Sequence, residues 1–437
     1  MRPREVWAHG IGGRADLPVP LELFIYGAAL VLVLSFGALA VLWPRPRLQD
    51  GVRNHRLAVP LGPAWGVLRV AGVAGLALVV VAGLIGTQGV TANIVPVTVW
   101  VVFWLVVPFA GAVAGDLWSA LNPWRTLASW LGLGGEGAVS QPPRLGIWPA
   151  ALAFLAFTWL ELVHPDPSRP WVLAVAALAY SAYLAGWMAW SGREAGLQAA
   201  DAFTVYNRLL SSLAPFGRDQ RGRPIWRGWL RALPALPAWP GLAVFVVAMI
   251  GTVTYDGLSS TPLWNDLSFR LLGPASSSMW LGTAALLATV GVIGAGYLAA
   301  CRAAARIAGS GVSAGRVAAD FAHTLVPIAL AYALAHYFTL VIFEGQLFLA
   351  ALSDPLGRGW DLFGTAGWRV NFTWLPPVAV WYVQLAVIVG GHLLGVVLAH
   401  DRALASFPAR RAVRSQYAML ALMVALTGLG LTILAAG

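Results

Sequence analysis

The sequence predicts an all-α protein, a polytopic membrane bundle of about ten transmembrane helices that forms one domain over residues 1–437. Its composition is one reason, because 59% of the residues are hydrophobic and 11% are charged, against roughly a quarter charged in soluble domains. Length is another, since apolar stretches of roughly 20 residues, enough to cross a bilayer, recur along the chain. Its 22 tryptophans and 28 prolines also suit a bilayer protein, because Trp rings settle at the interfaces and neighbouring helices satisfy backbone groups near Pro.

Ten apolar stretches, separated by charged or turn-forming residues, are the expected spans. They cover residues 21–43, 64–87, 94–114, 146–163, 171–190, 239–254, 278–300, 318–343, 374–398 and 413–435. The sixth is short for a crossing of about 30 Å. An even number of spans places both ends of the chain on the same side of the membrane.

The arginines predict which side that is. The chain contains 28 arginines and no lysine. If both ends lie outside, 21 of the 28 arginines fall in inner loops or at inner span ends, and the other seven lie outside. Cytoplasmic loops of membrane proteins carry an excess of basic residues. We therefore expect a multi-pass protein of a bacterial cytoplasmic (inner) membrane with the N-terminus and the C-terminus outside.

The residue types that are scarce exclude several chemistries. A retinal or pyridoxal Schiff base and the phosphate-binding P-loop both need a lysine, so neither is expected. The single Cys301 excludes an intrachain disulfide and a cysteine-ligated iron–sulfur cluster. The net charge of +10 comes from arginines scattered between spans, so nucleic acid is not an expected partner. The expected partners are the lipid bilayer and other membrane protein subunits.

One inner segment, at about residues 191–238, is more than a connector. Phe203, Tyr206, Leu209 and Leu210 recur at helical spacing and precede a group of arginines. This pattern predicts a cytoplasmic amphipathic helix that lies on the inner membrane surface, followed by a basic turn attracted to anionic headgroups. A partner-binding site is the alternative reading of the same pattern.

Polar residues within spans eight and nine are the predicted site. Charged and imidazole side chains are costly in lipid and are functional candidates where they face the bundle interior. At 1.5 Å per residue, His323 lies on the order of 8 Å from the inner end of its span and His392 about 12 Å from His400. Asp320, His323, His392 and His400 are therefore predicted to gather around a divalent transition metal (zinc, copper or iron), a haem or a proton relay. The alternative is a metal-free, hydrogen-bonded structural pair.

A second, looser set lies toward the outer side, and His336 is its candidate metal ligand. Its other members are polar residues of the same two spans and carboxylates expected in outer loops: Tyr332, Glu344, Tyr382, Gln384, Asp256, Asp354 and Asp361. Haem b is the less favoured cofactor, because His323 and His336 are thirteen residues apart and point roughly 220° away from each other around the helix.

Three sequence runs resemble a known family. The residues HGIGGRADLPVP at 9–20, GDLWSALNPWRTL at 115–127 and GHLLGVVLAHDRAL at 391–404 are similar to those of polytopic actinobacterial membrane proteins named fenitrothion hydrolase. The resemblance implies cleavage of phosphotriester-like compounds, which would use metal-activated water.

Three function classes therefore stay open at the level of sequence. One is a metal-dependent membrane hydrolase, an enzyme assignment that the resemblance alone supplies. Another is a secondary transporter or channel with an intramembrane His/Asp path. The remaining class is a haem- or metal-binding accessory subunit of a membrane redox complex.

Overall fold

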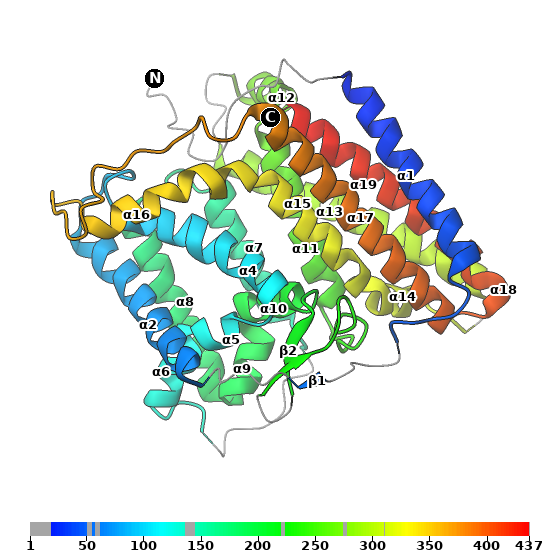
Figure 1. Ribbon diagram of the computed structural model, residues 1–437, viewed down its shortest axis with the longest axis horizontal. Coiled ribbons are helices and arrows are strands. Elements are labelled where there is room, and N and C mark those ends of the chain that lie inside the picture. Colours follow the sequence, from blue (N-terminus) through cyan, green and yellow to red (C-terminus); the bar gives the residue numbers. More distant parts are fainter. Residues whose placement is uncertain are drawn as a thin grey trace.

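The structure, a computed structural model, describes residues 19–49, 55–56, 62–135, 145–219, 223–273, 278–309 and 311–436. The described chain is almost entirely helical, which confirms the predicted all-α membrane bundle (Figure 1). Nine helical stretches in these residues are long and apolar enough to cross a membrane. Of the motif at residues 9–20, the first ten residues lie outside the described residues.

The nine long stretches include several that are built from more than one helical element. They are α1 (Leu21–Leu42), α2 (Gly62–Ile85), α3 (Ile94–Val97) with η1 (Thr98–Val106) and α4 (Val107–Ala114), α8 (Pro170–Ser191), α11 (Leu242–Ser259), α13 (Met279–Ala308), α14 (Ala314–Phe321) with η3 (Ala322–Leu325) and α15 (Val326–His336), α17 (Pro377–Ser406), and α18 (Ala409–Ala412) with η5 (Arg414–Gln416) and α19 (Tyr417–Ala436).

The remaining elements are shorter. The helices are α5 (Trp118–Leu121), α6 (Pro123–Trp130), α7 (Trp148–Leu162), α9 (Arg193–Ala200), α10 (Ala202–Ser211), α12 (Pro262–Leu272), η4 (Leu340–Glu344) and α16 (Gln346–Ser353). The strands are β1 (His55–Arg56), β2 (Phe216–Arg218) and β3 (Pro224–Trp226), antiparallel in the order β1-β3-β2.

The predicted and observed spans differ at particular ends. The fourth predicted span is α7, which has only 15 residues, and it runs from the lower toward the upper end of the bundle in Figure 1. The sixth, α11, extends to Ser259, five residues beyond the predicted end. The eighth does not continue to residue 343, because α15 ends at His336 and the chain turns into η4 and α16.

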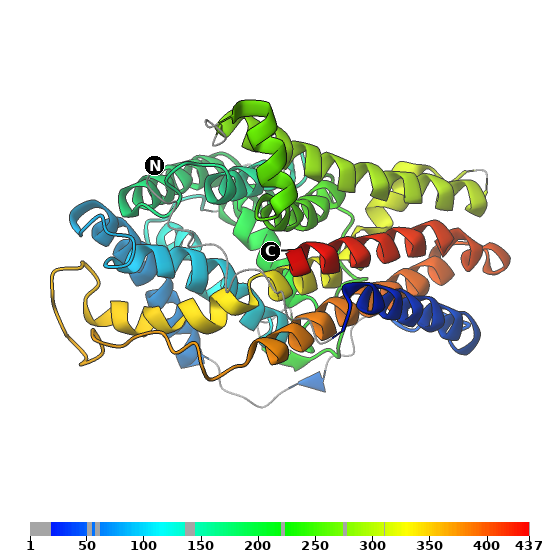
Figure 2. The ribbon, with the colours of Figure 1, turned by 90° about the horizontal axis from the view of Figure 1, so that it is seen from above.

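Small residues set the closest helix packing. A side chain at Gly391 of α17 would place its Cβ 2.2 Å from Ala331 Cβ and 2.8 Å from Pro327 O of α15. Glycine therefore lets the two backbones approach, which is how membrane helices gain packing contacts without a hydrophobic driving force. Helices α1, α17 and α19 lie side by side in both ribbon views (Figure 1, Figure 2).

The predicted surface helix lies inside the bundle, so that interpretation is wrong. All four residues of its apolar pattern, Phe203, Tyr206, Leu209 and Leu210 of α10, are buried. Tyr206 stacks on Trp104 of η1 with ring centroids 5.0 Å apart. The apolar face of α10 packs against aromatic side chains of the protein and not against lipid headgroups. An amphipathic pattern by itself cannot distinguish a helix on the membrane surface from a helix inside the bundle.

A buried carboxylate begins this interior helix. Asp201 caps α10 and accepts hydrogen bonds from Phe203 N, Tyr180 Oη, Thr204 Oγ1 and Asn122 Nδ2 at 2.6–3.0 Å. Burial raises the pKa of Asp201, and the donated hydrogen bonds act in the opposite direction. The polar groups at the N-terminus of α10 therefore form their hydrogen bonds within the protein.

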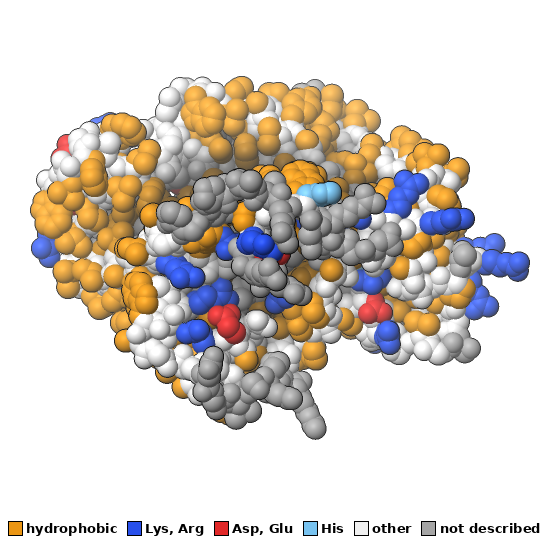
Figure 3. Space-filling view, turned by 60° about the horizontal axis from the view of Figure 1, so that its bottom comes forward, with side chains coloured by type: hydrophobic (Ala, Val, Ile, Leu, Met, Phe, Trp, Pro, Cys, Tyr) orange, Lys and Arg blue, Asp and Glu red, His pale blue; other side chains and the backbone are white. Residues whose placement is uncertain are grey.

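Basic side chains gather at the end of the bundle that carries the small sheet, as Figure 3 shows. Arg227 donates to the carbonyls of Ala214 and Ser211 at the end of α10, and Arg218 lies over the Trp65 ring. These arginines therefore hold the segment of β2 and β3 against the bundle. The same end is the inner one in the arginine-based orientation.

Candidate functional site

A buried acid and imidazole pair lies between α11 and α15. Asp256 of α11 is 3% exposed, and its Oδ2 lies 2.9 Å from His336 Nε2. Tyr337 Oη donates to the same oxygen at 2.8 Å. Because α15 ends at His336, its last residue and the residue after it can both turn toward α11. Two neighbouring side chains thus converge on one carboxylate.

A second carboxylate belongs to the same region. Glu161, one residue before the end of α7, lies near enough to Asp256 for their charges to interact, and the Trp104 indole lies beside it. Glu161 Oε2 and Trp104 Nε1 are buried and have no hydrogen-bond partner among the described residues. Together, Glu161, Asp256, His336 and Tyr337 are called the outer cluster here. Two acids and an imidazole are thus buried in the same region of the membrane bundle, where ionisable side chains are functional candidates.

Irregular helix surrounds the outer cluster. Trp104 belongs to η1, a nine-residue π-helical stretch, and η4, another π-helical stretch, begins three residues after Tyr337. The two π stretches meet, because a Cβ at Gly345 would lie 3.6 Å from Val101 Cγ1. Such stretches occur often at functional sites. Within a membrane they are tolerated where protein or water surrounds them.

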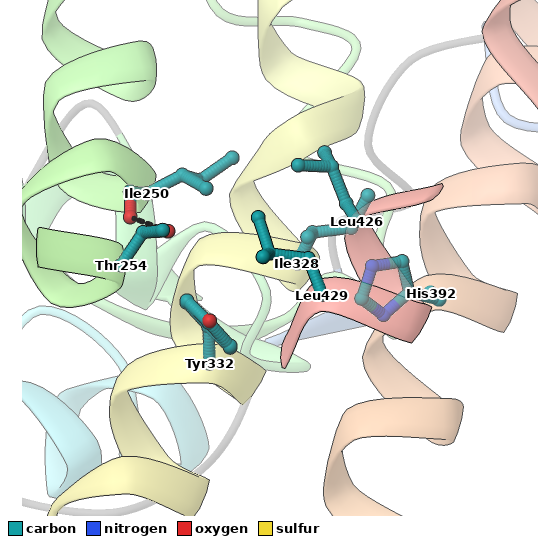
Figure 4. A pocket seen from close by; sticks show the side chains of 7 residues that line it. All are labelled: Ile250, Thr254, Ile328, Tyr332, His392, Leu426 and Leu429. Atoms are coloured by element: carbon teal, nitrogen blue, oxygen red, sulfur yellow. Dashed lines mark hydrogen bonds between the residues drawn. The ribbon is translucent and has the colours of Figure 1, made fainter. Parts of the chain in front are cut away.

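A small cavity lies inward from the outer cluster, between α11, α15, α17 and α19 (Figure 4). Its volume is about 10 Å³. The lining residues are Ile250, Thr254, Ile328, Tyr332, His392, Leu426 and Leu429. Tyr332 Oη and His392 Nε2 are buried atoms without a hydrogen-bond partner among the described residues. The apolar lining therefore contains two polar atoms that can still take a hydrogen bond.

Three of the five predicted metal ligands are held by separate partners. Asp320 pairs with Arg316 at an exposed position, and His336 contacts Asp256. His400 lies 3.2 Å from Gln416 Oε1 and 3.1 Å from Trp43 O. In the described part of the chain, no three His, Cys, Asp or Glu side chains group so that they could hold a metal ion. The metal centre stays a prediction of the sequence.

His323 and His392 occupy successive turns along the α15–α17 contact. Gly395 of α17 lies opposite Thr324, and Gly391 lies opposite Pro327. His392 lines the cavity, whereas His323 is not among its lining residues. Each ring has a buried Nε2 without a hydrogen-bond partner among the described side chains. The depth predicted for the two rings is similar, but their surroundings differ.

Asp401 has a structural role at the inner end of α17. Its carboxylate accepts hydrogen bonds from Trp43 Nε1, Gln49 Nε2 and the amides of Arg47 and Leu48. Arg402 instead donates to Pro234 O. Asp401 therefore holds the segment after α1 against the inner end of α17.

Two members of the outer cluster were missed or misplaced by the sequence reasoning. Asp256 was expected in an outer loop, because the sixth span was ended at residue 254. Glu161 was not considered, although it is a carboxylate inside a predicted span, which was the criterion applied to spans eight and nine. Applying that criterion to every span would have found it.

The fold and the outer cluster define a polytopic α-helical membrane protein with acidic and imidazole side chains buried in its bundle. No family model, curated protein or solved structure matches this chain.

Proposed function

We propose that this protein is a proton-linked transporter of a bacterial cytoplasmic membrane, in which the Asp256–His336 pair carries the proton. The observation that carries the proposal is the 2.9 Å contact between these side chains inside an apolar bundle. Ionisable groups are costly at that depth and mark ion or proton paths in membrane proteins. Glu161 supplies a second proton-accepting group beside the pair.

The pair can pass a proton without a metal. A proton that binds His336 Nδ1 makes an imidazolium, whose charge the adjacent Asp256 carboxylate balances. Transfer of the Nε2 proton to Asp256 Oδ2 leaves a neutral ring and a neutral acid, and the Tyr337 hydroxyl, which donates to Oδ2, stabilises the carboxylate before transfer. Onward transfer of the proton from Asp256 to the nearby Glu161 carboxylate restores the Asp256 carboxylate. The ring regains its starting tautomer when it releases the proton on Nδ1 and takes up another proton on Nε2.

Discontinuous helices also support transport. The chain from residue 314 to residue 353 breaks into α14, η3, α15, η4 and α16, and α10 is a ten-residue helix inside the bundle. Secondary transporters build their binding sites from such broken helices, whose free ends face substrate and coupling ions. Helix irregularity and the outer cluster occur in the same part of the molecule.

The test is proton movement into liposomes that contain the purified protein. A potassium gradient with valinomycin supplies the driving potential, and an internal pH-sensitive dye reports proton entry. Asp256→Asn keeps the size of the side chain but removes its ability to ionise, so we expect entry to fall to the rate of protein-free liposomes.

Asp320→Asn is the matched control, because Asp320 lies outside the outer cluster and forms an ion pair with Arg316. This variant should keep the wild-type rate. Equal rates for wild type and Asp256→Asn, or no entry through the wild-type protein, would overturn the proposal.

Phosphotriester hydrolysis and a transition-metal ion stay expectations that rest on the family resemblance and on residue types. Turnover of an aryl phosphotriester by the same purified protein, with loss of turnover after chelation, would support them. Proton entry and hydrolysis are independent measurements, so either can fail alone.

A further inference from the structure

We propose that the cavity between α11, α15, α17 and α19 binds one water molecule, which joins Tyr332 Oη to His392 Nε2. The water site stands on the cavity itself. Its role, which is to extend the proton path inward from the outer cluster, rests on the proposed function.

The size and lining of the cavity fit one water. Its volume of about 10 Å³ is near the lower limit for a single water molecule, roughly 10–15 Å³. A buried water also needs two to four polar partners. Tyr332 Oη and His392 Nε2, both on lining residues and both without a hydrogen-bond partner among the described atoms, supply two. Thr254 Oγ1, which donates to Ile250 O at 2.8 Å, can accept a further bond.

The hydrogen bond at Nδ1 of His392 determines whether the ligand at Nε2 must donate or accept a hydrogen bond. His392 Nδ1 lies 2.9 Å from Ile388 O, and a carbonyl oxygen only accepts, so the ring proton is on Nδ1. Nε2 is then a bare acceptor in the neutral ring. The ligand must donate to Nε2 and, at the same time, exchange a hydrogen bond with a phenol. Water does both, whereas a metal cation or an anion would fit only one of the two.

Both polar side chains are fixed in place by close packing. A Cβ at Gly430 of α19 would lie 2.6 Å from Cε2 of the Tyr332 ring. On α17, Gly391 and Gly395 hold the helix directly against α15 on either side of His392. Figure 4 shows the Tyr332 and His392 side chains at the same cavity, among Ile328, Leu426 and Leu429.

The cavity and the outer cluster follow each other along one face of α11 and one face of α15. Tyr332 and His336 are four residues apart and lie one turn from each other on α15. On α11, Gly257 follows Thr254 by three residues, and a Cβ at Gly257 would lie 3.7 Å from His336 Nδ1. His336 Nδ1 thus faces the strip of α11 that reaches the cavity. The inward order is Asp256, His336, Tyr332, water and His392.

Infrared difference spectroscopy tests the water site. Exchange into water labelled with oxygen-18 shifts the O–H stretch of an internal water and leaves protein O–H groups unshifted. Tyr332→Phe and His392→Leu should each remove one shifted band. Tyr297→Phe is the matched control, because Tyr297 is also buried but does not line this cavity and donates to Ala318 O. It should keep the band.

Proton entry into liposomes then tests the role. Tyr332→Phe should lose most of the wild-type rate while keeping the thermal unfolding temperature of the wild type within a few degrees. A retained band in both variants overturns the water site. A lost band with an unchanged proton rate overturns its role in the path. Wild-type proton entry that Asp256→Asn does not reduce would instead contradict the proposed function, and the infrared result would still decide the water site.

Discussion

A single carboxylate accounts for much of the order at the inner end of α17. Both oxygens of Asp401 accept hydrogen bonds, and the donors are two backbone amides, an indole and an amide side chain from residues 43–49. Asp401 itself is completely buried. Both carboxylate oxygens of Asp401 accept hydrogen bonds, so a side chain that replaces one oxygen with an N–H donor would leave some of these donors without an acceptor.

Asp401→Asn should therefore destabilise the protein. The amide side chain turns an NH₂ group toward donors, and each buried donor left unpaired costs roughly 1–3 kcal/mol. Thermal and denaturant unfolding of the detergent-solubilised protein measure the loss. Asp320→Asn, at an exposed ion pair, should change stability by no more than about 0.5 kcal/mol. Similar losses in the two variants would contradict the assigned role of Asp401.

At the scale of elements, α15 contributes to both the outer cluster and the cavity, and α17 packs against it and contributes His392 to the cavity. The close approach of α15 and α17 depends on glycine, since Gly391 meets the backbone of α15 at Pro327, and Gly395 meets the Ile328 side chain and the backbone at Thr324 of η3. Gly390 stands beside them with nothing within 4 Å of an added Cβ. Gly390 and Gly391 are thus neighbours on one helix with different surroundings, and substitutions at the two positions can be compared directly.

Gly391→Ala should weaken the contact between these helices. The added methyl would meet Ala331 Cβ at 2.2 Å and Pro327 O at 2.8 Å, and overpacking of this kind typically costs about 1–3 kcal/mol. Gly390→Ala should leave stability unchanged or raise it by up to about 1 kcal/mol, because Ala favours the helix. Unfolding of both variants in detergent measures the difference. A smaller loss for Gly391→Ala than for Gly390→Ala would rule out the close approach.

At the scale of the whole molecule, the described helices return the chain to the end of the bundle at which α1 begins. The nine long stretches and α7 alternate in direction, so the beginning of α1 and the end of α19 lie at the same end of the bundle (Figure 1). The basic side chains gather at the other end (Figure 3). With the positive-inside pattern, this arrangement places the end of α19 outside.

Cysteine labelling tests that orientation. Ala436→Cys lies at the exposed end of α19, and Ser406→Cys lies at the exposed end of α17 on the opposite side of the bundle. A membrane-impermeant maleimide should label Ala436→Cys in intact cells and Ser406→Cys only after permeabilisation. The natural Cys301 is completely buried, so the unmodified protein is the unlabelled control. The reverse pattern would show that the orientation is inverted.

The sequence by itself determined the helical class, nearly all of the spans and a testable orientation, because apolar length and arginine position are local properties of the chain. It also identified His336, His392 and Tyr332 as polar residues within spans. Only the tertiary structure decided which of these side chains meet. Asp256 and His336 are 80 residues apart in the chain, and the α10 pattern was equally compatible with lipid and with protein. Depth estimates for spans eight and nine assumed straight α-helices, whereas η3 and η4 change the rotation per residue on either side of α15. That change in rotation is the physical reason why histidines at similar predicted depth have different partners.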